Sequence, residues 1–442
     1  MLVTLLFTFP GVIFSIFSFA RWRRGVFFFV LYSTVSGMIS ALTFPALIPM
    51  LTKEIFFLAP AYGGFIYFIT HNKLVKPPPQ LWIPISVSCS IVLVQLFNPN
   101  LDNILLAVIG LKVWLFYIPV AFLSFYMFRT EIELIKFLRV MLLITPIPCV
   151  VGIIQYIGGL TFGYQEFMTA IYGAETAFNV TQGFTDFSAD VGALYVRIPG
   201  TFSFITPYTG YLLAMVPVSY ILWKIDPSPS WRTFAKVVLL LLVVSATLSG
   251  SRGTSIFMAL FFVILFCLQG QFFTLLKVIL LLLGLGSLLL LSVDISLVSM
   301  FGLLVTLIPH YLDTIVLGGL LEAFSKTLFG LGLGTNTGAA RYAMENQGAI
   351  FAIENYYAKS YIELGLLGLL MTIFIFLSPL HYYIKNKKLC NNPKVKIVTS
   401  SFVAFILLIA IHSFKGWQID LDPINFYFWF YYGLLFRTYT LF

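Results

Sequence analysis

The sequence predicts an all-α polytopic membrane protein, and three observations support this. Of the 442 residues, 60% are hydrophobic, 17% aromatic and only 10% charged, whereas a soluble domain carries roughly 25% charged residues. Apolar runs of the ~20 residues needed to cross a bilayer recur along most of the chain. Lys and Arg gather in alternate connections between these runs. We therefore expect a single integral membrane domain over residues 1–442, covered mostly by lipid.

Thirteen apolar runs are candidate membrane spans. Because backbone polar groups find no water partner in lipid, each run should be a helix. The N-terminal run lacks the basic region and cleavage site of a signal peptide, so we interpret it as a span. If one of the first two runs is only half-buried, the count becomes twelve. The runs cover residues 2–20, 25–50, 54–70, 81–97, 103–128, 138–160, 201–223, 235–250, 254–270, 274–293, 361–380, 397–414 and 424–441.

The basic residues give the predicted orientation. With Arg21, Arg23 and Arg24 on the inside, alternation of the spans places 18 of the 26 Lys and Arg residues inside, as the positive-inside rule requires. Lys112 lies within a span. The net charge of +9 therefore reflects topology, and we expect no nucleic-acid partner. The basic residues on the outside are Lys53, Arg197, Arg252, Lys326, Arg341, Lys359 and Lys415.

Two outside segments are long, residues 162–200 and residues 294–360, and loops of this length are usually functional. Within the second, the run 298–309 is apolar but too short to span, which is typical of a re-entrant or amphipathic interfacial helix. We see no internal repeat and no soluble domain. The fold is therefore predicted as about 12–13 transmembrane helices with two long extracytoplasmic loops.

No pattern in the sequence indicates a metal or another cofactor. Asp420 and Asp422 form a D-x-D pattern, but Pro423 directly after it favours a turn into the last span. The four cysteines lie far apart without metal-ligand spacing, and we interpret them as apolar packing residues. They are Cys89, Cys149, Cys267 and Cys390.

Arginines on the outer side are candidates for function, because topology selects against them there. Arg197 lies in RIPGTF (197–202) and Arg252 in the polar break SGSRGTS (249–255). A guanidinium at the membrane face matches the oxygens of a phosphate or pyrophosphate bidentately. The alternative for both is an arginine that reaches toward lipid headgroups.

The second long loop ends in the glycine-rich run FGLGLGT (329–335), followed by ENYY at 354–357. No strand–turn–helix unit surrounds the glycines, so this is not a nucleotide-binding loop. On a helix, Glu354, Tyr357 and Tyr361 would share one face. A carboxylate near the outer arginines could act as a general base toward a sugar hydroxyl. The alternative is an acidic residue at a solvated helix N-terminus, and the lone His310 and His412 are more typical of structural roles.

Together these motifs resemble the O-antigen polymerase and O-antigen ligase superfamily. RIPGTF, SGSRG, GLGLGT and ENYYAKSYIELGLLGLL occur in the order of that family, with GIIQ (152–155) before them and HSFKGWQIDLDPINFYFWFYYGLLF (412–436) after them. The resemblance covers residues from about 130 onward. It implies a GT-C-like, inverting membrane glycosyltransferase that uses a sugar chain carried on undecaprenyl pyrophosphate. An acceptor hydroxyl would attack the anomeric carbon, and the lipid pyrophosphate would leave.

The resemblance also implies roles for individual residues. Arg197 and Arg252 would hold the pyrophosphate, and Glu354 would be the catalytic base. Ligases of the superfamily carry a histidine directly before the asparagine, where this chain has Glu354, so we favour a polymerase over a ligase. The other expected substrate-binding residues are Asn355, Tyr356, Tyr357, Arg341, Lys359, His310 and Lys415.

The expected reaction joins lipid-linked repeat units into O-antigen, capsule or exopolysaccharide at the outer face of the bacterial inner membrane. The expected partners are lipid-linked oligosaccharide donor and acceptor, membrane lipid and a chain-length regulator protein. A flippase is the rival reading, but flippases place ionisable residues at mid-membrane or show repeat symmetry. Here Lys112 is the chief such residue. Convergence of Arg197, Arg252 and Glu354 on one outward-facing cavity would favour the enzyme.

Overall fold

The computed structural model describes residues 2–101, 103–181, 197–274, 276, 316–337, 353–387 and 392–442. All regular structure in these ranges is helical, and none of them contains a β-strand. Within the described residues, six helices are long and apolar enough to cross a membrane, or seven if Trp22–Ser33 and Ser36–Leu42, bent by 58°, form one span. The expected 12–13 spans are not reached there, because several apolar helices are only 10–17 residues long. The predicted all-α, membrane-spanning class is confirmed.

The first half of the described chain is a series of helices, several of them short. They are α1 (Leu2–Ala20), α2 (Trp22–Ser33), α3 (Ser36–Leu42), α4 (Leu47–Thr52), the π-helical η1 (Lys53–Leu58), α5 (Ala59–His71), α6 (Pro79–Gln95), α7 (Ile104–Leu115), α8 (Val120–Met127), α9 (Glu131–Ile144), α10 (Pro146–Phe162), α11 (Tyr164–Tyr172) and α12 (Ala174–Val180).

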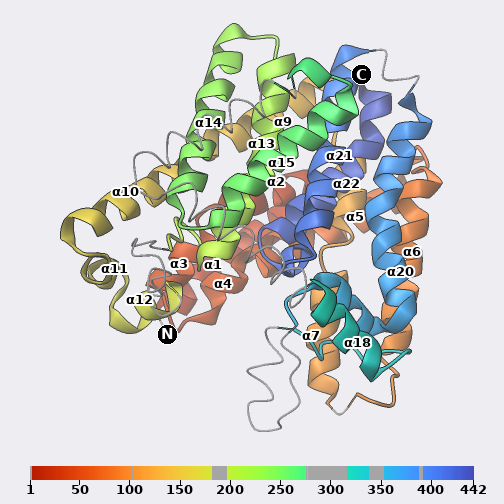
Figure 1. Ribbon diagram of the computed structural model, residues 1–442, viewed down its shortest axis with the longest axis horizontal. Helices are drawn as coiled ribbons and strands as arrows, with labels where there is room; N and C mark the ends of the chain where they lie inside the picture. Colours follow the sequence, from red (N-terminus) through yellow and green to blue (C-terminus); the bar gives the residue numbers. More distant parts are fainter. Residues whose placement is uncertain are drawn as a thin grey trace, which may run out of the picture.

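The second half contains the longest helices. They are α13 (Ile205–Ile225), α14 (Pro229–Leu248), α15 (Arg252–Gln269), α18 (Gly319–Lys326), α20 (Tyr356–Lys385), α21 (Pro393–His412), the 3₁₀ turn η4 (Gln418–Asp420) and α22 (Ile424–Leu441). Figure 1 shows α10, α11 and α12 at one side of the bundle and α6, α7, α18 and α20 at the other, with α21 and α22 between them.

A helix occupies every predicted span that falls within the described ranges. The span expected at 274–293 lies almost wholly outside them, as does the interfacial helix expected at 298–309. The run 25–50 is not one helix, which corrects the prediction for that segment. After α2 the backbone turns, and Thr201 bonds to the freed groups, with its hydroxyl donating to the Thr34 carbonyl and its carbonyl accepting from the Met38 amide at 2.7 Å.

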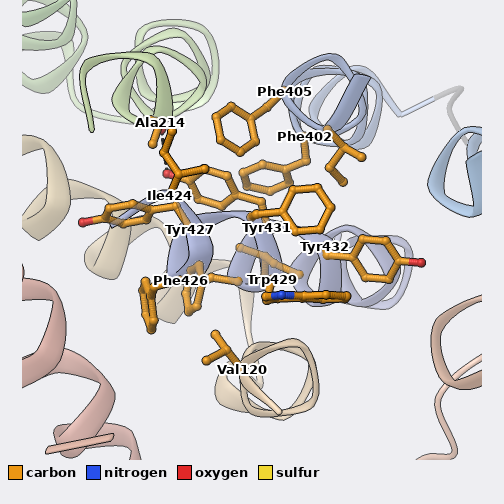
Figure 2. Packing of buried hydrophobic residues seen from close by; sticks show 14 of the residues in the cluster. Val120, Ala214, Phe402, Phe405, Ile424, Phe426, Tyr427, Trp429, Tyr431 and Tyr432 are labelled. Atoms are coloured by element: carbon orange, nitrogen blue, oxygen red, sulfur yellow. Dashed lines mark hydrogen bonds between the residues drawn. The ribbon is translucent and has the colours of Figure 1, made fainter. Parts of the chain in front are cut away.

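Two aromatic-rich helices form the centre of the bundle. In α13, 94% of the 18-residue apolar stretch that could cross the membrane is buried. The helix α22 is buried along nearly its whole length. Figure 2 shows the α22 rings packed between neighbouring helices. The Tyr431 ring stacks on Phe402 with centroids 4.9 Å apart, and its hydroxyl donates to the Ala214 carbonyl at 2.8 Å. Gly433 allows α8 to pass close, because a Cβ there would overlap the Ala121 carbonyl.

The outer helices expose apolar side chains. Only 28% of the corresponding apolar stretch of α14 is buried. On this helix, Leu240 and Val237 are 66% and 56% exposed. Large apolar surfaces of this kind are unfavourable in water. This pattern, apolar outside and densely packed inside, is that of a protein surrounded by lipid.

Candidate functional site

A cavity of about 290 Å³ lies where several predicted outer ends of helices meet. Its wall is built from the first turns of α13 and α15, the end of α21, the segment 415–421, and Glu354. We call it the Glu354 cavity. Many of its lining residues come from three of the motifs found in the sequence, SGSRGTS, ENYY and the segment that begins at His412.

Glu354 is an exposed residue directly before α20. The sequence-based expectation placed it on a helix face with Tyr357 and Tyr361, and this is wrong. Asn355 caps α20 by accepting hydrogen bonds from the amides of Tyr357 and Ala358 at 2.9 and 3.3 Å. Because the N-cap residue marks the start of the helix, Glu354, one position earlier, lies outside α20. It belongs to a non-helical stretch that lines the cavity.

Two hydrogen bonds fix the backbone on both sides of Glu354. The indole Nε1 of Trp417 donates to the Ile353 carbonyl at 2.8 Å, and the Tyr356 amide donates to the Ser413 carbonyl at 2.9 Å. Both partners belong to the segment that follows α21. The carboxylate is therefore held on a fixed backbone against the segment 413–417.

Lys415 supplies a cation in the same cavity. Its Nζ lies against the first turn of α15, 3.4 Å from the point where a Cβ on Gly253 would be. Burial lowers the pKa of Lys415; the nearby Glu354 carboxylate opposes this, and the nearby Arg197 guanidinium adds to it. Lys415 thus lies close enough to both Glu354 and Arg197 for their charges to act on it.

Hydrogen bonds hold the RIPGTF segment, which carries Arg197, to two other motifs. The Ile198 amide donates to the Ser249 carbonyl of SGSRG at 3.1 Å. The Gln155 side chain, from GIIQ, pairs with both backbone groups of Gly200. Tyr164 of α11 donates its hydroxyl to the Arg197 carbonyl. The half-buried Arg197 is therefore carried by a segment fixed on three sides.

Arg252 is the first residue of α15. The residues on either side of it, Ser251 and Gly253, both line the Glu354 cavity, so the start of α15 lies at the wall of the cavity. The position of its side chain is not among the described features. Two further expected substrate-binding residues, His310 and Arg341, lie outside the described ranges altogether.

The side chains of Asn355, Tyr356, Tyr357 and Lys359 are buried and have partners within the protein. Asn355 is the helix cap. The Tyr357 hydroxyl donates to the Ala410 carbonyl at 2.8 Å, and the Tyr356 ring lies 5.7 Å from that of Trp114. None of these four side chains is among those lining the Glu354 cavity, so a substrate-binding role for them stays a prediction.

Lys359 belongs to a buried polar network. It forms an ion pair with Asp420, and its Nζ is 3.9 Å from Glu363. Glu363 accepts hydrogen bonds from the Trp114 indole at 2.7 Å and from the backbone amides of Gly334 and Asn336, both at 3.0 Å. This network ties the glycine-rich run to α20 and α7.

Asp420 and Asp422 each form an ion pair with a different lysine. Asp420 pairs with Lys359, and Asp422 pairs with Lys53 at 2.6 Å. Burial raises the pKa of Asp420 to about 6, although the Lys359 charge acts in the opposite direction. The carboxyl is thus still ionised at neutral pH. Within the described part of the chain, no group of three His, Cys, Asp or Glu residues could hold a metal ion.

Sequence reasoning gave no functional weight to two residues of this region, His412, which was assigned a structural role, and Gln155. His412 lines the cavity and stacks on Phe257 with ring centroids 3.9 Å apart. Its Nδ1 is buried and has no hydrogen-bond partner among the described residues. Gln155 was noticed only as part of GIIQ. In both cases the available signal was a polar side chain near the end of an apolar run.

The sequence matches no protein-family model and no curated protein. The chemistry of the cavity is thus the basis for a functional assignment. A carboxylate can accept a proton, and an ammonium beside a guanidinium can hold an anionic leaving group. The arrangement suits a reaction that activates a hydroxyl next to a bound phosphate or pyrophosphate.

Proposed function

We propose that this protein is an inverting membrane glycosyltransferase of the GT-C type. It polymerises oligosaccharide repeat units carried on undecaprenyl pyrophosphate into a surface polysaccharide. The observation that carries the proposal is that one cavity holds Glu354 and Lys415 beside Arg197 and the first turn of the helix that begins with Arg252. The order of motifs from GIIQ to the C-terminal aromatic helix supports the same class.

In the proposed reaction, the hydroxyl of the acceptor sugar attacks the anomeric carbon of the donor. The bond from that carbon to the pyrophosphate oxygen breaks, and the configuration inverts. The hydroxyl proton passes to the Glu354 carboxylate. Undecaprenyl pyrophosphate leaves with the bonding electrons, and Lys415, Arg197 and Arg252 stabilise the charge that develops on it.

The proposed location is the bacterial inner membrane, with the Glu354 cavity facing the periplasm or exterior. The distribution of Lys and Arg supports this orientation. The cavity is built from the N-terminal ends of α13, α15 and α20 and the C-terminal end of α21. Alternation along the chain assigns all four of these ends to the outer side.

The test is an analysis of lipid-linked glycans in a strain that lacks this protein. Single repeat units should accumulate on the lipid, and the wild-type gene should restore long chains. Purified protein in liposomes with lipid-linked repeat units should produce a ladder of longer chains and release undecaprenyl pyrophosphate.

Other products would identify other functions. Transfer of the glycan to an acceptor not linked to undecaprenyl pyrophosphate would indicate a ligase. Translocation of lipid-linked glycan without any change of length would indicate a transporter. Either result would overturn the polymerase assignment.

A further inference from the structure

A second cavity, of about 320 Å³, adjoins the Glu354 cavity, and Phe204 and Leu421 line both. It lies among α3, α4, η1, α7 and the segment 420–425. Its volume is in the range of small-molecule binding sites, ~300–1,000 Å³. The charged side chains that line it are Lys53, Glu54, Lys112, Asp420 and Asp422.

These charges are already balanced within the protein. Lys53 pairs with Asp422 and Lys112 pairs with Glu54, each at 2.6 Å. An added small ion would have to compete with a partner that is already in contact, so the second cavity is poorly suited to an isolated phosphate or metal ion. A neutral ligand avoids that competition.

Hydrogen-bond acceptors remain after this pairing. Asp422 Oδ1 is buried and has no hydrogen-bond partner among the residues that the structure describes. The Asp422 side chain as a whole is 30% exposed and lines the cavity, so its carboxylate is accessible to a hydroxyl donor on a ligand. Each carboxylate of an ion pair also keeps lone pairs that a further donor can use. Ser40 and Asn425 add uncharged polar groups to the wall.

Aromatic side chains line the same cavity. Phe202, Phe204 and Tyr117 contribute to its wall, and the Tyr117 hydroxyl is oriented by donating to Glu54 at 2.8 Å. A sugar ring presents hydroxyl donors around its edge and a C–H face above and below. Carboxylates together with aromatic rings match both kinds of surface.

We propose that the second cavity binds the terminal sugar residues of the acceptor glycan. This inference rests on the proposed function and adds the site of the acceptor. Because the two cavities share Phe204 and Leu421, a saccharide in the second cavity can extend a hydroxyl toward Glu354. The pyrophosphate of the donor would lie on the opposite side, at Lys415 and the start of α15.

A cavity-filling pair of variants tests the site without breaking an ion pair. Ile109→Trp places an indole into the second cavity. Val108→Trp is the matched control, because Val108 is the neighbouring residue on α7 and is 56% exposed. Ile109→Trp should raise the acceptor KM at least tenfold, with kcat and donor KM within twofold of wild type. Val108→Trp should behave like wild type.

A direct binding measurement separates this inference from the proposed function. The probe is the lipid-free repeat-unit oligosaccharide from the polysaccharide of the same cell, measured by equilibrium dialysis. Wild-type protein and Val108→Trp should bind it, and Ile109→Trp should bind at least tenfold more weakly. Lys112→Gln, at a half-exposed position, should also weaken binding and provides a second variant that is expected to fold.

Three results would overturn the inference: no binding by the wild type, equal binding by folded Ile109→Trp and wild type, or an increase in donor KM alone. If the wild type binds the saccharide but never lengthens a chain, the polymerase assignment fails while the saccharide site stands.

Discussion

Gln155 and Gly200 form a closed pair of hydrogen bonds in the interior of the protein. The Gln155 Nε2 donates to the Gly200 carbonyl at 2.9 Å, and the Gly200 amide donates to Gln155 Oε1 at 2.8 Å. Both residues are buried. The pair joins α10 to the segment that carries Arg197, so a side chain that is not among those lining the cavity helps to hold that segment in place.

Gln155→Ala should therefore weaken donor binding. It leaves two buried backbone groups unsatisfied, at a cost of about 1–3 kcal/mol each, and Arg197 loses its fixed position. The donor KM should rise about tenfold or more, with a smaller change in kcat. Ile154→Ala, at an exposed position on the same helix, is the control. An unchanged donor KM in a folded Gln155→Ala protein would show that this pair does not position Arg197.

Glu354→Gln should reduce kcat by about 10²–10⁴, because it keeps the shape of the side chain and removes its basicity. KM values for both substrates should change little, and Glu354→Asp should retain part of the activity. The measurement is the initial rate of chain elongation at saturating donor. Glu322→Gln is the matched control, since this carboxylate is about half-exposed on α18 and pairs with Lys326.

If Glu354→Gln elongates chains at close to the wild-type rate, another group takes the proton. His412 is then the first candidate, because it lines the same cavity. In that case, the double variant that combines Glu354→Gln with His412→Gln should lose the activity that remains in Glu354→Gln alone.

Arg252→Ala should nearly abolish elongation, by about 10²–10³ in rate, the usual cost of losing one preorganised transition-state donor. Arg252→Lys should restore little, because an ammonium lacks the planar fork that binds two oxygens. Elongation rates are compared at equal amounts of protein in the membrane. Arg24→Ala, at an exposed position on α2, should leave the rate unchanged. Long chains from Arg252→Ala would exclude the proposed pyrophosphate contact.

Donor affinity should fall at alkaline pH because of Lys415. Burial lowers its pKa from the usual 10.5, so the ammonium is present below this lowered value and is lost as pH rises through it. Binding of lipid pyrophosphate should therefore weaken as pH rises through this lowered pKa, below the 10.5 of an ordinary lysine. Lys415→Arg should remove most of this decline, since a guanidinium stays charged throughout. Identical pH profiles for the wild type and Lys415→Arg would contradict a role for the Lys415 charge.

Glu363→Ala should destabilise the fold. It leaves the Trp114 indole and two backbone amides without an acceptor and removes a buried charge beside Lys359. Losing one member of a buried charged network costs about 3–5 kcal/mol, so the midpoint of thermal unfolding in detergent should fall by on the order of 5–10 °C. Glu322→Ala breaks an exposed pair and should shift the midpoint by no more than about 2 °C.

Apolar runs alone were enough to place the long helices, but not α11, α12 and α18, which lie in the segments predicted as long loops. A run of about 20 apolar residues has few options other than a helix in lipid, and α13, α14 and α21 lie close to their predicted ranges. The break after α2 could not be predicted in this way. It depends on hydrogen bonds to Thr201, 167 residues from Thr34, and hydropathy carries no information about such a partner.

The candidate site was predicted unevenly for the same reason. Glu354 and Lys415 are chemically conspicuous on the predicted outer side, and both line the cavity. Lys359 was expected beside them as a substrate-binding residue. It is instead fully buried against Asp420, its partner 61 residues away. The N-cap at Asn355 places Glu354 outside α20. The position of a cap depends on backbone geometry, which the spacing of apolar residues in the sequence does not reveal.

The burial of α22 has a consequence for how the protein is made. The helices that surround it, among them α8, α13 and α21, all precede it in the chain and are synthesised first. Until α22 enters, Ala121 lacks its close contact with Gly433, the Ala214 carbonyl lacks the Tyr431 hydroxyl, and the Phe402 ring lacks its stacking partner. A chain that ends before Ile424 would lack the central helix of the bundle. Such an incompletely packed chain should be a substrate for membrane proteases and chaperones.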